Sequence, residues 1–343
     1  MPSRRTLVAI IAGSVVVLLG LGVAGYVLSR DSATSATGDL IAYGCKERKN
    51  PWYAICSIAS DGTDPQRLTE KLETTDPAWS PDGRRIAFTR NEEVGESTPF
   101  SSDDVFVMDA DGSDERRLTS ERAGRSSGQP TWSPDGEQLA YVHGPSVSSA
   151  VPSRFGGLFA MNDDGSDARR LTQGRADTDP NWSPDGREIV FVRGENLASF
   201  TDAADDVYIL DVASGTTRQL TRSPPGVFEA APAWSPDGSQ IAFVRVTTST
   251  QFDGKASIYV INADGTSEKL LLANKFFAHR SRASLAWSSD GGTLAFETSS
   301  MPGCTSISLL EIASGAIRPL TSCSRPIEST VAPAWQPAAT AQR

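Results

Sequence analysis

Short apolar segments alternate with Gly-containing turns along most of the chain, and they recur in a fixed order. In one repeat, the first segment ends at Trp79, and the next three are residues 86–88 (I-A-F), 105–108 (V-F-V-M) and 116–119 (R-R-L-T). Short apolar runs at even spacing, separated by Gly and Asp turns, favour antiparallel β-structure over helices. The pattern therefore predicts four strands in each repeat.

The motif W-S-P-D-G marks each repeat at the end of its first strand. Unaltered copies begin at Trp79, Trp132, Trp182 and Trp234, with W-S-S-D-G at Trp287 and a shortened W-Q-P at Trp335. Pro presets φ and Gly adopts the left-handed conformation, so the motif predicts a tight turn between two strands. A period of about 50 residues is typical of stacked units, none of which buries its apolar face alone.

The two ends of the chain hold complementary parts of one more repeat. Residues 40–69 contain the second, third and fourth strands, and the segment that ends at Trp335 supplies the first. Pairing of the two ends would complete this repeat and remove exposed sheet edges. We therefore predict an all-β, six-bladed β-propeller with four-stranded blades over residues 39–337.

The repeat A-W-S-P-D-G-x-x-I-A-F, followed by N-A-D-G and R-R-L-T, resembles the TolB-type (WD40-like) propeller repeat over about residues 38–337. The G-H and W-D signatures of ordinary WD40 repeats do not occur. The resemblance implies a propeller that binds partner proteins. TolB also carries an N-terminal α/β domain, for which this sequence has no counterpart, so we do not expect its Tol-specific role to carry over.

The N-terminal region predicts a membrane anchor. Residues 7–28 are uncharged and would form a helix about 33 Å long, enough to span the bilayer. Arg4 and Arg5 precede the span, which favours a cytoplasmic N-terminus and an extracytoplasmic propeller. The predicted parts are a cytoplasmic N-terminus (1–6), a transmembrane signal anchor (7–28), a polar linker (29–38) and, after the propeller, a C-terminal tail (338–343). The alternative is a cleaved signal peptide and a secreted protein.

The predicted topology separates the loops onto two faces. The chain would enter and leave the propeller on the face that carries the S-P-D-G turns, and the short linker would keep that face toward the membrane. Longer and more varied loops lie on the opposite, outer face, where we expect any binding residues. Between second and third strands these loops are 90–103, 143–156, 193–205 and 245–256; between blades they are 120–129, 173–179, 222–231 and 273–284.

Charge and cysteine content refine this picture. The formal net charge is −10 and no basic stripe occurs, which argues against a nucleic-acid partner. The four cysteines are Cys45, Cys56, Cys304 and Cys323, and each consecutive pair is brought together by a predicted hairpin. An even number of cysteines in an exported chain favours two local disulfides. A zinc site is the alternative, but no C-x-x-C or neighbouring His supports it. We expect no bound metal and no cofactor.

The candidate binding residues lie at the outer mouth of the predicted central channel, mostly where the innermost strands begin. They are Thr74, Asp76, Gln129, Asp177, Asp179, Glu229, His279, Arg280, Arg282 and Glu328. The carboxylates would suit a cation or a basic peptide, while His279, Arg280 and Arg282, with Lys275, form a positive sector. The alternative is an ordinary solvated rim, with the Asp that precedes Pro acting as a turn residue.

Two features bear on catalysis. Residues 124–128 match G-x-S-x-G, but we place them in a polar loop between blades rather than in the strand–turn–helix elbow that the motif requires. His143 and His279 are the two histidines, and neither has an evident acid–Ser partner in the sequence. Prolyl oligopeptidase-like enzymes also carry propellers, but their catalysis resides in an attached hydrolase domain. We expect Trp79 and the equivalent Trp of each repeat to pack between blades.

The sequence thus favours a membrane-anchored, extracytoplasmic propeller. It would act as a monomeric module that binds an envelope protein or peptide, or as a scaffold, through its outer face. The alternative is a carbohydrate-active lyase or hydrolase, or a ligand sensor, that uses the channel mouth. An enzyme would need an acid, a base and a charge-stabilising group converging on one pocket, whereas a binding face needs spread contacts.

Overall fold

The computed structural model consists of β-strands and connections throughout the residues it describes. These are residues 40–46, 53–70, 73–92, 102–121, 124–145, 156–174, 176–194, 204–248, 254–278, 284–301, 304–323 and 329–337. The predicted all-β class is confirmed. In this part of the chain no helix is long and apolar enough to cross a membrane. The predicted anchor (7–28), linker (29–38) and tail (338–343) lie outside the described residues.

The strands form four-stranded antiparallel groups that follow one another along the chain. The first group joins the two ends of the propeller, in the order β24-β1-β2-β3. Its strands are β24 (Ser329–Trp335), β1 (Leu40–Lys46), β2 (Ala54–Ala59) and β3 (Gln66–Arg67). The next group is β4 (Thr74–Trp79), β5 (Arg85–Glu92), β6 (Ser102–Asp109) and β7 (Arg116–Arg117). The third is β8 (Arg125–Trp132), β9 (Gln138–Pro145), β10 (Gly157–Asn162) and β11 (Arg169–Arg170).

The second half of the propeller repeats this pattern. Two groups are joined into one sheet by a single parallel pair between Asp205 and Phe228. They are β12 (Asp177–Trp182), β13 (Glu188–Gly194), β14 (Asp205–Asp211) and β15 (Thr217–Gln219), then β16 (Val227–Trp234), β17 (Gln240–Thr248), β18 (Gly254–Asn262) and β19 (Lys269–Ala278). The last group is β20 (Leu285–Trp287), β21 (Thr293–Met301), β22 (Cys304–Glu311) and β23 (Ile317–Pro319).

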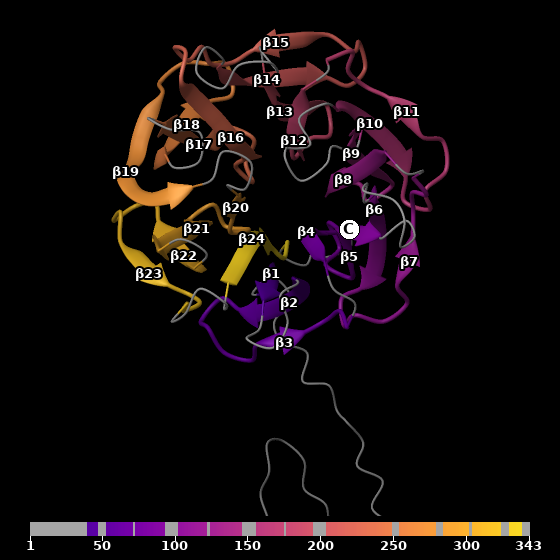
Figure 1. The fold of residues 1–343 in the computed structure, drawn as a ribbon. Helices are drawn as coiled ribbons and strands as arrows, with labels where there is room; N and C mark the ends of the chain where they lie inside the picture. The colour runs from indigo at the N-terminus through magenta and orange to yellow at the C-terminus, as the bar shows by residue number, and fades with distance from the viewer. Residues whose placement is uncertain are drawn as a thin grey trace, which may run out of the picture. The chain divides into compact units, whose positions relative to one another are not determined.

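The groups are arranged as a ring with the first strand of each group innermost (Figure 1). Neighbouring innermost strands contact each other in the order β4, β8, β12, β16, β20 and β24, and β24 contacts β4. The ring is closed between the two ends of the described chain by the antiparallel pairing of β1 with β24. Beyond this pairing, the Gln336 side-chain amide donates to the carbonyl of Gly83, 3.1 Å away.

The S-P-D-G turns share one hydrogen-bond pattern that explains why the motif recurs. In the first copy, the Ser80 hydroxyl donates to Asp82 Oδ1 at 2.6 Å and accepts from the backbone N–H of Arg85 at 2.9 Å. Asp82 also accepts from the backbone N–H of Arg84. Ser288 and Asp290 repeat this pattern in W-S-S-D-G. The turn therefore depends on Ser, Asp and Gly more than on Pro.

The R-R-L-T segments form very short outermost strands whose Thr continues the sheet. The Thr119 hydroxyl accepts the backbone N–H of Val105 at 3.0 Å, and Thr172 does the same for Leu158. Thr69, Thr221 and Thr321 occupy equivalent positions in other groups. A side-chain oxygen thus satisfies a buried N–H where the backbone ladder has ended.

The core lies between neighbouring sheets rather than inside any one of them. Trp132, for example, is buried in one cluster with Val105 and Val107 of the preceding sheet and with Leu139 of its own. Trp79, Trp182 and Trp234 are buried in equivalent clusters. The predicted packing of these Trp side chains between repeats is confirmed. No sheet buries its own apolar face, which is why the repeats require a ring.

All eight predicted outer-face loops are shorter than the sequence indicated, because strands extend into their ends. Between blades, residues 125–129, 177–179 and 227–231 belong to β8, β12 and β16, and residues 273–278 belong to β19. The predicted bounds 120–129, 173–179, 222–231 and 273–284 were therefore wrong. In β8, backbone pairing continues past the apolar stretch, as in Arg125 with Pro145, and polar side chains conceal it from a hydrophobicity pattern.

The disulfide between Cys45 and Cys56 is confirmed. It links β1 to β2 with Cα atoms 5.8 Å apart. Cys323 is also disulfide-bonded. Its predicted partner, Cys304, begins β22; their pairing stays a prediction.

Candidate binding site at the channel mouth

Five of the six innermost strands have a kink near their outer end, and it sorts the candidate residues into two sets. Asp76, Gln129 and Asp179 each precede a Pro and have φ of 52°, 53° and 52°. Ala231 and Ala332 occupy the same position with similar φ values. The pairing register shifts at this point, as between Thr178 and Asn181, which marks a β-bulge. A residue at positive φ is uncommon outside Gly, and its recurrence indicates a backbone fixed by the surrounding sheet.

The residues two positions before the kink are buried inside the sheets. Thr74 and Asp177 are 0% exposed and Glu229 is 1% exposed. Thr74 contacts the Thr69 hydroxyl at 3.2 Å. Their side chains are thus committed to partners within the protein, and the structure does not bring them to the open surface that the sequence analysis assigned to them.

Asp177 and Glu229 are each paired with an Arg from the adjacent second strand. Arg193 donates two hydrogen bonds to Asp177, at 2.7 and 2.9 Å. Arg245 Nε and Nη2 both donate to Oε1 of Glu229, at 3.0 and 2.7 Å, and its Nη1 donates to Glu268. The hydrogen bonds that Arg193 donates to Asp177 raise the pKa of Arg193. Burial raises the pKa of Glu229, although Thr221 and Arg245 act in the opposite direction.

The residues at the kink connect neighbouring innermost strands around the axis of the ring. The Gln129 side chain donates to Asp179 Oδ1 at 2.7 Å and accepts from the backbone N–H of Asp179 at 3.0 Å. Asp179 Oδ2 in turn accepts from the backbone N–H of Ala231 at 3.1 Å. Asp76 accepts from Thr75 at 3.1 Å. We call Asp76, Gln129 and Asp179 the channel-mouth set, and these three candidate residues are the ones that the structure brings together.

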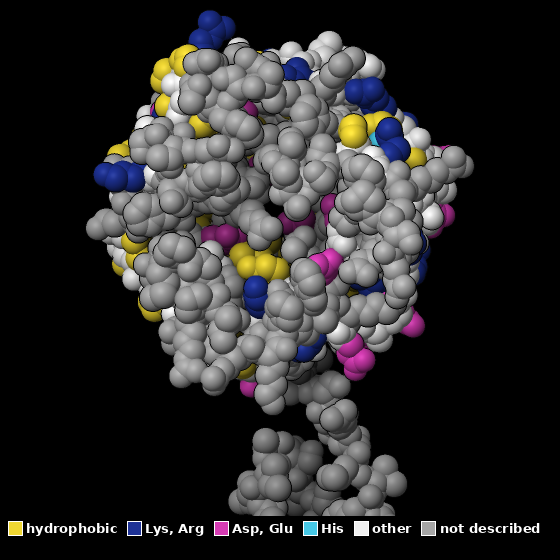
Figure 2. All heavy atoms as spheres, viewed as in Figure 1, with side chains coloured by type: hydrophobic (Ala, Val, Ile, Leu, Met, Phe, Trp, Pro, Cys, Tyr) yellow, Lys and Arg dark blue, Asp and Glu magenta, His cyan; other side chains and the backbone are white. Residues whose placement is uncertain are grey.

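The channel-mouth set contains two carboxylates, Asp76 and Asp179, that repel each other. Burial, with a contribution from the nearby Asp76 carboxylate, raises the pKa of Asp179 to about 6. Hydrogen bonds from Ala231 and Gln129 offset only part of this shift. Figure 2 shows Asp and Glu side chains around the hollow at the centre of the ring. A cation placed there would favour the charged form of Asp179.

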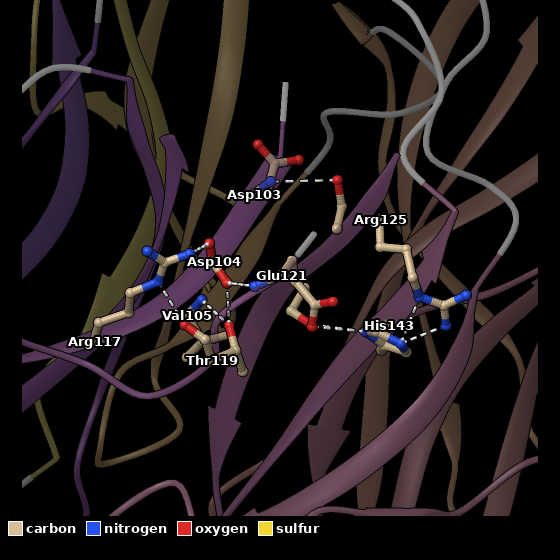
Figure 3. A network of polar contacts seen from close by, with 10 residues as sticks. Asp103, Asp104, Val105, Arg117, Thr119, Glu121, Arg125 and His143 are labelled. Carbon is tan, nitrogen blue, oxygen red and sulfur yellow. Dashed lines mark hydrogen bonds and ion pairs between the residues drawn. The ribbon is translucent and has the colours of Figure 1, made fainter. Parts of the chain in front are cut away.

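A second polar cluster lies farther out, between the β4–β7 and β8–β11 groups (Figure 3). His143 Nδ1 lies 3.0 Å from both Glu121 Oε1 and the Ser127 hydroxyl. Arg125 Nε donates to His143 Nε2 at 3.2 Å. Burial lowers the pKa of His143, and Arg125 acts in the same direction, whereas Glu121 acts against both. The expectation that His143 has no acid–Ser partner was wrong.

The geometry of this cluster does not suit nucleophilic catalysis. The Ser127 hydroxyl donates to Glu121 at 2.7 Å, so its proton is not held by the imidazole. His143 Nε2 accepts from Arg125, which leaves Nδ1 to carry the ring proton toward Glu121. Ser127 is 0% exposed. A Ser–His pair acts as a nucleophile and base only when the Ser donates to an unprotonated ring nitrogen and can reach a substrate.

Asp104 holds the segment that carries Glu121. Its carboxylate accepts from the Thr119 hydroxyl at 2.7 Å and from the backbone N–H of Glu121 at 2.9 Å, and it is paired with Arg117 (Figure 3). Burial raises the pKa of Asp104 against these contacts. Asp206 binds the equivalent segment at Ser223. The network therefore fixes the connection between repeats and has a structural role.

The G-x-S-x-G match at residues 124–128 lies largely in strand β8, not in a loop as predicted. The Ser126 hydroxyl accepts the backbone N–H of Asp103 at 3.3 Å. A strand continues through the motif to Trp132, so the strand–turn–helix geometry of a nucleophile elbow is not formed here. Among the described residues, no group of three His, Cys, Asp or Glu side chains is placed to hold a metal ion.

Four candidate residues, His279, Arg280, Arg282 and Glu328, lie outside the described residues. Sequence reasoning also missed Arg193, Arg245 and the contact between His143 and Glu121. A signal for these existed in the repeats. Arg90, His143, Arg193 and Arg245 all stand two positions after the aromatic residue of the second strand. The three Arg residues lie opposite the candidate residues Thr74, Asp177 and Glu229, and His143 lies opposite Ser127.

Comparisons with known proteins agree with the ring of repeated sheets. The family described as TolB beta propeller domain matches residues 27–200. The uncharacterized protein Atu1656 of Agrobacterium fabrum is 30% identical over 223 residues, which cover 64% of this chain and 68% of that protein. The uncharacterized peptidase YuxL of Bacillus subtilis is 31% identical over 221 residues, or 62% of this chain, but these span only 27% of YuxL.

Solved structures show the same fold. The crystal structure of TolB from Acinetobacter baumannii matches with a TM-score of 0.66 at 19% identity, over 88% of this chain and 68% of that one. At this identity the likeness shows the fold alone.

Proposed function

The chain belongs to the TolB β-propeller domain family. We propose that it is a binding module of the cell envelope, which recognises a basic segment of a protein or peptide at its outer face. The observation that carries this proposal is the channel-mouth set, in which Asp76 and Asp179 lie close enough for one charge to raise the pKa of the other. The backbone that presents them is fixed by the kinks at the innermost strands.

The chemistry of the channel-mouth set selects a cationic ligand. Two carboxylates that repel each other are both stabilised by a Lys or Arg side chain placed between them. Gln129 lies beside Asp179 and offers a neutral donor and acceptor for a peptide backbone if its present hydrogen bonds rearrange. The other buried carboxylates, Asp177 and Glu229, already have an Arg partner and are not free for this role.

We also propose that residues 7–28 anchor the protein in the membrane, with the propeller on the extracytoplasmic side. The linker of residues 29–38 reaches at most about 30 Å when extended, so the face with the S-P-D-G turns would look toward the bilayer and the channel mouth away from it. The strand groups are best counted as six blades, one of which is shared by the two ends of the chain. We expect the propeller to act as a monomer.

The test is fluorescence anisotropy with a labelled decapeptide of alternating Lys and Ser, added to the full chain at pH 7.5. We expect Asp76→Asn/Asp179→Asn to weaken binding about tenfold or more, because two charges facing the ligand are lost. The control is Asp64→Asn/Asp114→Asn, which removes two exposed carboxylates that also have positive φ but lie in the turns between third and fourth strands. Equal affinity of both variants would contradict the proposal, as would equal binding of a Glu-Ser decapeptide.

A further inference from the structure

We propose that the free edge of β19 (Lys269–Ala278) is a docking site for an acidic, extended segment of a partner protein, which would add to the sheet as another strand. The site is separate from the channel-mouth set and lies on the outside of the ring. Figure 1 shows β19 as the long orange arrow at the periphery. The argument rests on the length of this strand, its unpaired edge and its charge.

The outermost strand is short in every other group. β3, β7 and β11 have two residues each, and β15 and β23 have three. β19 has ten and pairs with β18 from Val260–Lys269 to Gly254–Ala278. Proteins usually keep exposed sheet edges short because a long edge invites pairing with another chain. The outermost strand β19, in the β16–β19 group, does not follow that rule.

The other edge of β19 has no strand partner in the described part of the chain, since β19 ends its sheet. β19 is ten residues long, but its pairing with β18 shifts register between Ile258 and Tyr259 and again between Ala256 and Ile258. Alternate residues direct their backbone N–H and C=O groups outward only within the regular parts on either side of these shifts. An extended peptide can form a backbone ladder with those parts of β19, which supplies affinity, while side-chain contacts supply selectivity.

The side chains at this edge indicate the character of the partner. Leu270 is 45% exposed, one of two large apolar side chains in the described residues with such exposure. Lys255 on β18 and Lys269 on β19 are exposed. The two strands together contain Lys255, Lys269 and Lys275 and no Asp or Glu, although the whole chain has a net charge of −10. An acidic segment with alternating apolar residues matches the charge of this edge.

A second copy of this chain is a poorer occupant. Pairing β19 with itself would bring together two edges that each carry the exposed Lys269, and would also join two molecules of net charge −10. Like charges across a strand pair are destabilising. The charge pattern therefore favours a different, acidic chain.

The test uses the full chain and a labelled peptide of sequence EVTVEVTVE, with KVTVKVTVK as the opposite-charge probe. Hydrogen exchange of residues 269–278 is followed by mass spectrometry. We expect the acidic probe to slow exchange there and the basic probe not to. We expect Lys255→Glu/Lys269→Glu to weaken the acidic probe about tenfold and to improve binding of the basic one. Arg84→Glu/Arg187→Glu, at exposed arginines in the turns between first and second strands, is the matched control and should bind as the parent does.

Several results would overturn the proposal. These are no binding of the acidic probe, binding that leaves exchange of residues 269–278 unchanged, or equal loss of affinity in the control variant. Protection that rises with protein concentration in the absence of probe would identify a second copy as the occupant instead. Protection by vesicles of anionic lipid, without protection by the acidic peptide, would identify a membrane surface.

Discussion

Two carboxylates only two residues apart, Asp177 and Asp179, have opposite roles in this propeller. Asp177 is buried and paired with Arg193, whereas Asp179 stands at a kink and lies in the wall at the centre of the ring. The alternation of side chains along a strand, interrupted by a bulge, decides which of them can meet a ligand. The same rule separates Glu229 from Ala231 in the next repeat.

The raised pKa of Asp179 predicts how stability depends on pH. The folded protein keeps the Asp179 proton up to about pH 6, whereas the unfolded chain releases it near the ordinary value of 3.8. The free energy of unfolding should therefore fall as pH rises between these two values. Asp179→Asn removes this loss, and we expect it to stabilise the protein by up to about 3 kcal/mol at pH 7.5 and not at pH 3.5.

Urea unfolding at the two pH values measures this difference. Asp114→Asn, at an exposed position with positive φ, serves as the control and should leave stability unchanged at both. A loss of stability in Asp179→Asn at pH 7.5 would mean that the carboxylate is stabilising as an anion, contrary to the account.

At the residue scale, sequence reasoning succeeded where a residue type recurs for a local reason. Ser80 and Asp82 act within their own turn, and Trp132 fills the space between sheets, so repetition alone identified both. Sequence reasoning did not distinguish the buried Thr74 from Asp76 at the channel mouth. The kink that gives their side chains different directions depends on pairing with the next strand. The contact of His143 with Glu121 joins two repeats and depends on their packing.

Three of the four-stranded groups have an Arg two positions after the aromatic residue of the second strand, and it lies over aromatic rings. In two of these groups the Arg also pairs with a buried acid. Arg193, for example, lies 4.9 Å from the centre of the Tyr208 ring and bonds Asp177. Strand existence and order were predictable from the repeats. Strand ends were not predictable in the same way: β8, for example, continues through the polar segment of residues 125–129, which has no apolar pattern.

Removing the Arg of this pair should cost more than removing the Arg of an exposed pair. Arg193→Ala leaves the Asp177 carboxylate fully buried without its cation, and we expect a loss of about 3 kcal/mol in the free energy of unfolding. Arg187→Ala breaks an exposed pair with Asp185 and should change stability by less than about 0.5 kcal/mol. Chemical denaturation measures the change in the free energy of unfolding of each variant. Equal changes would mean that water hydrates the Asp177 carboxylate once Arg193 is removed, contrary to this account.

The whole molecule is closed by a strand from the far end of the sequence. β24 pairs with β1 and continues into Gln336, whose side chain bonds Gly83. The incomplete repeats at the two ends of the sequence made this closure predictable. The long β19 was not predictable, because its blade has no R-R-L-T segment to mark a normal outermost strand.

Loss of the closing strand should destabilise the entire ring. A chain that ends at residue 328 lacks β24 and exposes the edge of β1, and we expect its Tm to fall by more than about 10 °C with a broader transition. A chain that ends at residue 337 keeps β24 and is the control. Circular dichroism melts compare the two, and an unchanged Tm without β24 would mean that the remaining sheets are stable as an open arc.

The measurement that tests the central claim most directly is the affinity of the Lys-Ser decapeptide between pH 5 and pH 8. If the channel-mouth set binds a cationic segment, the affinity of the parent protein should rise as Asp179 ionises around pH 6. The affinity of Asp179→Asn should be weaker at pH 8 and nearly independent of pH. The same pH profile in both proteins, or no binding by the parent, would contradict the assignment of this site.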